Sequence, residues 1–137
     1  MTPNPFARWT ALAPHFHAAL RIVTAFMFIL AGTSKLFAFP VGMPPDDGTA
    51  TMWTQIWVGG VLEALGGTLV LLGLWTRPVA FILAGEMAVA YFQFHAPRSF
   101  WPTVNGGGAA VLDCFIFLWL SAAGAGPWSM DALRKRT

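Results

Sequence analysis

The chain has 137 residues, of which 56% are hydrophobic and 10% are charged, and its formal net charge is +2 at pH 7. A soluble domain of this size needs more polar surface than these residues supply, and the mean hydropathy of +0.61 is typical of a chain in lipid. The basic residues lie near the chain ends and in turns, without the stripe that binds nucleic acid. We therefore expect one membrane-embedded domain that has lipid, and no nucleic acid, as a partner.

Four apolar segments follow one another, at about residues 18–39, 56–74, 78–95 and 108–124. At roughly 1.5 Å rise per residue, the longer two cross a hydrocarbon core of roughly 30 Å, and the shorter two cross it with their flanking residues. Backbone groups in lipid must pair within their own segment, as they do in a helix. The sequence therefore predicts an all-α fold in which residues 1–137 form a single antiparallel bundle of four transmembrane helices.

The first predicted element, residues 18–39, follows a segment with the aromatic and basic motif FARW at 6–9, which suits the level of lipid headgroups. Arg21 lies near the cytoplasmic start of this span and is expected to extend toward the headgroups without a functional role. Lys35 near the exit, and the lack of a clean cleavage site after the span, argue against a cleavable signal peptide. We expect this segment to remain in the mature protein.

The second predicted element carries a carboxylate between two glycine pairs, in the stretch GGVLEALGG at 59–67. Gly59, Glu63 and Gly67 are spaced by four residues and so share one face of a helix. Small residues let a neighbouring helix approach closely, and a carboxylate is costly in lipid. This face is therefore expected to point into the bundle.

Short connections precede the last two elements. Pro78 in the turn WTRP at 75–78 suits the first turn of a helix, so the second and third elements are expected to form a tight antiparallel hairpin. The fourth element follows the loop HAPRSFWPTVNGGG at 95–108, in which Asn105 is expected to cap the helix and the glycines to permit an unusual turn. The chain closes with GAGPWSMD at 124–131 and a basic tail.

The basic residues also predict the orientation of the chain. Four spans place one set of basic residues on one side, namely Arg8, Arg21, Arg77, Arg134, Lys135 and Arg136, and leave Lys35 and Arg98 on the other. By the positive-inside rule, both termini are expected in the cytoplasm. The expected location is the inner (plasma) membrane, as a multi-pass protein.

Three acids fall within the predicted spans. Counted from the outer helix ends at 1.5 Å per residue, Glu63, Glu86 and Asp113 lie roughly 10, 14 and 8 Å below the outer surface. Lys35 lies slightly higher and can reach down to one of them. We interpret Lys35, Glu63 and Glu86 as a buried polar centre for proton-coupled chemistry or ligand binding. The alternative is that the acids are neutral and only form hydrogen bonds between helices.

Cysteine and histidine restrict the possible chemistry. Cys114 is the single cysteine, so an intrachain disulfide and paired-cysteine exchange are excluded. His15 and His17 fall on the opposite side of the membrane from His95, so neither a bis-histidine haem nor a histidine-rich metal site is expected within one chain. The sequence also has no flavin or iron–sulfur motif.

Aromatic residues cluster with His95 in the loop before the fourth element. His95, Trp101 and Asn105, together with Phe94 and Phe100, are interpreted as an outer pocket for an aromatic head group such as a quinone. The alternative is that these aromatic residues only anchor the chain at the membrane surface.

The motifs AGTSKLF at 31–37, GGVLEALGGTLVLLGLWTRP at 59–78, EMAVAYFQFH at 86–95, NGG at 105–107 and the closing GAGPWSMD resemble the DoxX family of small four-span membrane proteins. The resemblance implies a place in membrane redox systems, because a related branch supplies subunits of a thiosulfate-oxidising, quinone-reducing enzyme and other members are linked to oxidative-stress assemblies. It points to Lys35, Glu63, the turn 76–78, His95 and Asn105.

One position departs from the family pattern. The family often has NGGE where this chain has NGGG, so Gly108 replaces an acid at the N-terminal end of the fourth helix. Asp113 lies about 140° further round the helix and does not substitute for that acid.

The leading interpretation is an integral membrane subunit or accessory of a quinone-linked redox complex, in which Lys35, Glu63 and Glu86 move protons while a quinone binds near His95 and Trp101. Whether the chain is itself an enzyme stays open, and any redox activity would depend on a partner or a bound quinone. One alternative is a structural or assembly subunit without chemistry. Another is a small proton or cation transporter, which would need a homo-oligomer because four spans make a thin bundle.

Overall fold

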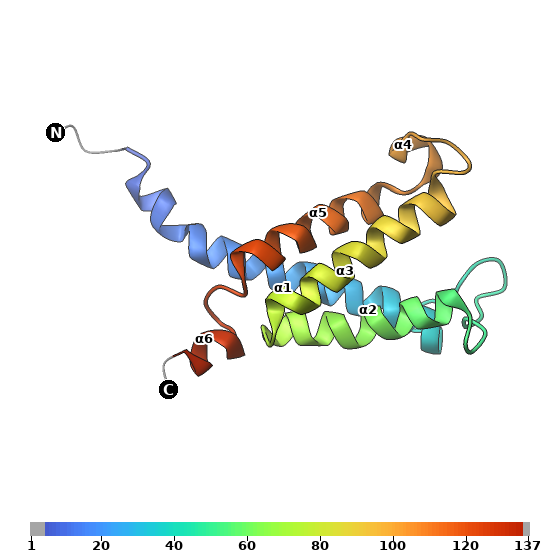
Figure 1. The fold of residues 1–137 in the computed structure, drawn as a ribbon, viewed down its shortest axis with the longest axis horizontal. Coiled ribbons are helices and arrows are strands. Elements are labelled where there is room, and N and C mark those ends of the chain that lie inside the picture. Colours follow the sequence, from blue (N-terminus) through green and yellow to red (C-terminus); the bar gives the residue numbers. More distant parts are fainter. Residues whose placement is uncertain (1–4, 136–137) are drawn as a thin grey trace.

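The computed structural model describes residues 5–135, and every regular element in this range is helical (Figure 1). The all-α prediction is thus confirmed for this range, while Arg136, used above to predict orientation, lies outside it. The elements are α1 (Ala7–Phe37), α2 (Gln55–Leu72), α3 (Thr76–Ala90), the π-helical turn η1 (Tyr91–His95), α4 (Pro102–Asn105), α5 (Gly108–Ala123) and α6 (Met130–Arg134).

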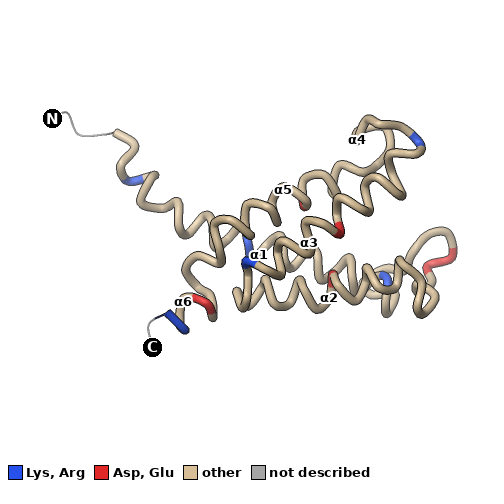
Figure 2. Tube along the Cα trace, in the orientation of Figure 1, with Lys and Arg blue, Asp and Glu red and all other residues tan. Residues whose placement is uncertain are grey.

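The four predicted apolar segments correspond to α1, α2, the continuous run of α3 with η1, and α5. The helices α1 and α2 are long and apolar enough to cross a membrane, and α5 is a shorter apolar helix. The first turns of α1 are exposed and extend beyond the rest of the bundle (Figure 1). Figure 2 shows that few charged residues interrupt the helices between the two ends of the molecule.

The helices pack in two pairs, α1 with α2 and α3 with α5, and the pairs contact each other mainly through α2 and α3. Glycines bring α1 and α2 together: a Cβ added at Gly32 would lie 2.6 Å from the backbone nitrogen of Ala64, and one at Gly67 would lie 2.9 Å from Ile29. The small-residue face of α2 is therefore used within the chain, against α1.

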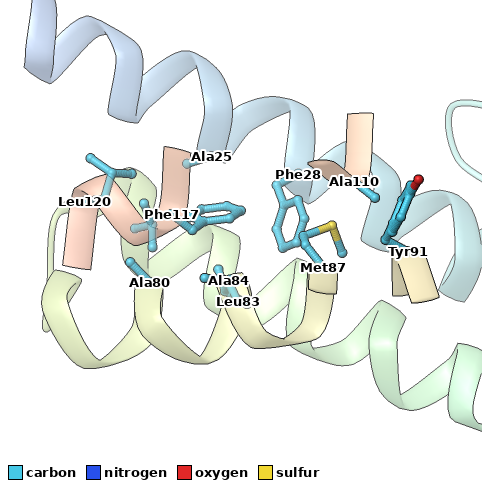
Figure 3. Close-up of a cluster of buried hydrophobic side chains, with 11 residues drawn as sticks. Ala25, Phe28, Ala80, Leu83, Ala84, Met87, Tyr91, Ala110, Phe117 and Leu120 are labelled. Carbon is cyan, nitrogen blue, oxygen red and sulfur yellow. The ribbon is translucent and has the colours of Figure 1, made fainter. Parts of the chain in front are cut away.

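A hydrophobic core joins the two helix pairs (Figure 3). Phe28 of α1 and Phe117 of α5 meet edge to face, with ring centroids 4.8 Å apart. Ala80, Leu83 and Met87 of α3 pack in the same buried cluster. Burying large aromatic side chains excludes lipid or water from this region and fixes α5 over α1.

The expected hairpin between the second and third elements is confirmed. Gly73 ends α2 with a φ of +65°, a left-handed conformation that glycine adopts without strain. Pro78 lies in the first turn of α3, which begins at Thr76. Three residues, 73–75, therefore reverse the chain.

The prediction that Asn105 caps the fourth long helix is wrong. Gly107 precedes α5 and provides no side-chain cap, whereas Oδ1 of Asn105 accepts a hydrogen bond from the Gly107 N–H at 2.7 Å. Gly106 has a φ of +73°, and a Cβ at Gly107 would lie 2.8 Å from the ring of Tyr91. Asn105 therefore closes the tight turn before the helix, and the adjacent glycines allow it to pack against Tyr91.

The expectation that Arg21 extends toward the headgroups is also wrong, because its side chain is fully buried. Its guanidinium donates to the carbonyls of Val70 at 2.7 Å and Leu71 at 2.5 Å, at the end of α2. It also donates to the carbonyls of Ala125 at 2.8 Å and Trp128 at 2.7 Å. Carbonyls at a helix end lack partners within the helix and attract a cation. Arg21 thereby ties α1 to α2 and to the segment before α6.

Asp131 fixes α6 on the turn between α2 and α3. Its two carboxylate oxygens accept hydrogen bonds from the N–H groups of Trp75 and Thr76, each at 3.0 Å, and its own N–H donates to the Gly73 carbonyl at 2.8 Å. Burial raises the pKa of Asp131, but the hydrogen bonds from Thr76 and Trp75 outweigh it, so the net pKa lies below its ordinary value. Asp131 therefore acts as the cap that α3 lacks in its own sequence.

Asp131→Asn is expected to lower the free energy of unfolding by about 1 kcal/mol at pH 7, because the amide cannot accept both hydrogen bonds. The folded-state pKa is depressed, so the stabilisation by the carboxylate is present above the ordinary pKa of about 4 and is lost as the pH falls through the folded-state pKa. Thermal unfolding in detergent should show a difference between the two proteins at neutral pH that shrinks below about pH 4. A difference independent of pH would contradict this role.

Candidate functional site

A cavity of about 280 Å³ lies between α1, α2 and α3, toward the end of the bundle that carries η1. The polar side chains that line it are Lys35, Gln55, Glu63, Glu86 and His95. The apolar residues that line it include Ile56, Met87 and Phe94. A mostly apolar hollow with a few convergent polar groups is typical of a small-molecule site.

Lys35 and Glu63 form an ion pair in this cavity. Nζ of Lys35, in the last turn of α1, donates to both carboxylate oxygens of Glu63, at the middle of α2. The side chain of Glu63 is 4% exposed and that of Lys35 is 28% exposed. Gly60 makes the approach possible, because a Cβ there would lie only 3.0 Å from Cβ of Lys35. The pair thus depends on a glycine one turn before the glutamate.

Glu86 faces the same cavity from α3. Its Oε2 atom is buried and has no hydrogen-bond partner among residues 5–135. Its Oε1 atom lies 3.1 Å from the position that a Cβ at Gly59 would occupy, so the glycine leaves room for the carboxyl group. Glu86 is therefore an acid of the site with a buried oxygen that no described residue bonds.

His95, the last residue of η1, also lines the cavity. Its Nδ1 atom is 3.1 Å from the backbone carbonyl oxygen of Asn105. The side chain of Asn105 is buried and donates to the Ser99 carbonyl at 2.7 Å and to the Tyr91 hydroxyl at 3.3 Å. Asn105 thus lies behind His95 and holds the loop that supports it, outside the lining of the cavity.

Trp101 lies apart from this group. Its side chain is 66% exposed and packs against the ring of Phe100, with centroids 5.7 Å apart. It does not line the cavity that holds His95. The structure thus brings together Lys35, Glu63, Glu86 and His95, and it leaves Trp101 outside.

Asp113 and Gly108, the position at which the family pattern often has an acid, both lie outside the cavity. Asp113, on α5, is not among the residues that line it. At Gly108, where the family pattern often has a glutamate, an added Cβ would meet no atom within 4 Å. Space for a larger side chain exists there, so crowding does not explain the glycine.

A polar bridge that the sequence did not indicate lies at the rim of the cavity. Nε2 of Gln55, the first residue of α2, donates to Oε1 of Gln93 in η1. Both residues are polar and lie at or near the ends of apolar segments, which is a weak signal because such residues normally contact water. The bridge joins α2 to η1 beside His95.

Comparison with known proteins identifies the family of the chain. The family model described as DoxX matches residues 16–96, which include α2, α3 and most of α1. An uncharacterized protein of Haemophilus influenzae is 46% identical over 121 residues, which cover 86% of this chain and 90% of that protein. No solved structure matches this chain. On the family match and this identity, the chain belongs to the DoxX family, whose members are small membrane proteins.

Proposed function

We propose that this chain is a multi-pass inner-membrane protein that binds a quinone head group and acts as a subunit or accessory of a quinone-linked redox complex. The observation that carries the proposal is the cavity in which Glu86, without a hydrogen-bond partner among the described residues, lies with His95 beside the Lys35–Glu63 ion pair. An unpaired carboxyl group in an apolar environment is costly, and such groups in membrane helices mark ligand or proton pathways.

In the proposed topology, α1, α2, α3 with η1, and α5 each cross the membrane, and both termini lie in the cytoplasm. The beginning of α1 and α6 lie at the same end of the bundle, as an even number of spans requires (Figure 1). That end carries Arg8, Arg77, Arg134 and Lys135, while the opposite end carries Lys35 and Arg98. The excess of positive charge favours a cytoplasmic location for the first end.

The residues of the cavity fit a quinone head group. A volume of about 280 Å³ is at the small end of ligand pockets, so it suits a head group whose tail lies in lipid. Ile56, Met87 and Phe94 offer apolar contacts to a planar ring. Lys35 directs hydrogens at both oxygens of Glu63, and an ammonium group has a third hydrogen for a ligand oxygen.

Bound in this cavity, a quinone supplies two-electron, two-proton acceptor chemistry, with its electrons delivered by a partner protein. Glu86 is the proposed group that holds a proton at the ligand, because its buried Oε2 atom lacks a hydrogen-bond partner among the described residues. In the Lys35–Glu63 pair the two opposite charges neutralise each other, and the contact fixes the position of the lysine ammonium group.

The first experiment is native mass spectrometry of the protein, extracted gently from its own membranes, with bound proteins and small molecules scored together. The proposal predicts a retained quinone and a stoichiometric redox partner. A bare homo-oligomer without quinone would contradict the proposal and favour the transporter. A large assembly without quinone would also contradict it and favour a structural subunit.

Glu86→Gln is expected to lower the quinone-dependent activity of that complex about 100-fold, a typical contribution of a positioned acid or base. Asp113→Asn is the matched control, since Asp113 lies in another helix and outside the cavity, and it should retain activity within about twofold. Equal activity of Glu86→Gln, Glu63→Gln and the unmodified protein would exclude a role of these acids in proton transfer.

A further inference from the structure

The hydrogen bond of His95, a residue that lines the cavity, determines which of its ring nitrogens carries a lone pair. A carbonyl oxygen only accepts, so Nδ1, 3.1 Å from the Asn105 carbonyl oxygen, carries the hydrogen. In the neutral ring, Nε2 is then an acceptor. This atom has no hydrogen-bond partner among the described residues, and His95 lines the cavity.

The π-helical turn brings His95 toward the face of Glu86. Nine residues separate the two, so an α-helix, at about 100° per residue, would place them on nearly opposite faces. Within η1, however, the Ala96 N–H donates to the Tyr91 carbonyl five residues earlier, at 2.8 Å. The extra residue in this turn removes about 100° of rotation and leaves a separation of about 80°. Both side chains therefore line one cavity.

The polar groups of the cavity differ in whether they already have a hydrogen-bond partner among the described residues. Lys35 directs two of its three donor hydrogens at Glu63, whereas Oε2 of Glu86 and Nε2 of His95 have no hydrogen-bond partner among the described residues. A quinone carbonyl oxygen only accepts, so it cannot pair with Nε2 of neutral His95. A phenolic hydroxyl both donates and accepts, so it pairs with His95 and still accepts a hydrogen bond from another group.

We infer that the cavity binds the reduced, dihydroxyaromatic form of its ligand, a quinol, in preference to the quinone, and that Nε2 of His95 is the group that discriminates between them. The inference rests on the proposed function and specifies the redox form that the site recognises. Buried polar groups reject a ligand that leaves them unpaired, so we expect at least tenfold discrimination. A tenfold preference corresponds to a reduction potential of the bound couple raised by about 30 mV for two electrons.

The test is anaerobic calorimetric titration of the purified full-length chain with a short-tailed benzoquinone and, separately, with the same compound chemically reduced to the quinol. We expect the quinol to bind at least tenfold more tightly. In His95→Gln the preference should fall to within about twofold, because an amide both donates and accepts. His17→Gln is the control, since the ring of His17 bonds to the Gly124 carbonyl at 2.8 Å and lies outside the cavity.

The outcomes separate this inference from the function on which it rests. Equal binding of the two forms, or tighter binding of the quinone, would overturn the inference and leave quinone binding intact. A preference that persists in His95→Gln would overturn the role of His95. Failure of both forms to bind would overturn the proposed function and this inference with it.

A second measurement does not depend on the folding of the variant. Nitrogen-15 NMR of the unmodified protein with labelled histidine distinguishes the two neutral tautomers by the chemical shifts of the ring nitrogens. The chain has three histidines, so the His17→Gln and His15→Gln proteins assign the signal of His95. The inference requires the hydrogen on Nδ1, and a hydrogen on Nε2 in the neutral ring would overturn it.

Discussion

Arg21→Met is expected to lower the free energy of unfolding by more than about 3 kcal/mol, one of the two largest effects of a single substitution in this chain. Methionine has a similar length, so the apolar part of the side chain is kept, but the hydrogen bonds to the Val70, Leu71, Ala125 and Trp128 carbonyls are lost. These carbonyls surround a fully buried side chain. The Val70 carbonyl keeps its hydrogen bond from the Gly73 N–H at 3.0 Å, whereas those of Leu71, Ala125 and Trp128 would lose the donor that Arg21 supplies. The cost of unpaired buried acceptors should dominate the effect.

The measurement uses Cys114, the single cysteine, as an internal probe of unfolding. In detergent, the temperature at which a thiol-reactive fluorophore labels this side chain should fall in Arg21→Met. Arg21→Lys should give an intermediate result, because one ammonium group cannot replace the fork of donors of a guanidinium. Arg8→Met, on an exposed turn of the same helix, is the control and should be nearly neutral. Equal labelling temperatures for Arg21→Met and Arg8→Met would show that water replaces the lost donors.

The helices of this fold could be predicted from sequence because their apolar segments are long and are separated by glycine and proline. The role of Arg21 could not, since a continuous apolar segment does not indicate which face of a helix is buried. Its partners at residues 125–128 are also distant in sequence, and backbone carbonyls carry no signature of side-chain type. The capping of α3 by Asp131 escaped prediction for the same reason.

Only part of the candidate site could likewise be predicted from the sequence. Lys35, Glu63 and Glu86 could be grouped from sequence because charged side chains in apolar segments need partners, and the depth of each follows from its place in the helix. His95 reaches the same cavity through a π-helical turn, for which the stretch YFQFH gives no clear signal. Nearness in sequence alone groups Trp101 with His95, whereas the side chain of Trp101 is exposed and lies outside the cavity.

Lys35→Met is expected to lower the free energy of unfolding by about 3–5 kcal/mol, because it leaves the carboxylate of Glu63 buried without its partner. The opposite change, Glu63→Gln, should cost less. The amide oxygen still accepts a hydrogen bond from Lys35, whose side chain is 28% exposed and can reach water. The two variants differ in cost because the charged side chain that stays behind is buried in Lys35→Met and partly exposed in Glu63→Gln.

The double variant Lys35→Met with Glu63→Gln tests whether the two residues act as a pair. It removes both charges, so no unpaired charge stays buried, and its unfolding temperature should lie above that of Lys35→Met alone. Labelling of Cys114 during heating measures all three variants against the unmodified protein. If the two single effects simply added, the ion pair would contribute no coupling, and the stability of the bundle would depend on the packing of α1 and α2 through Gly32 and Gly60.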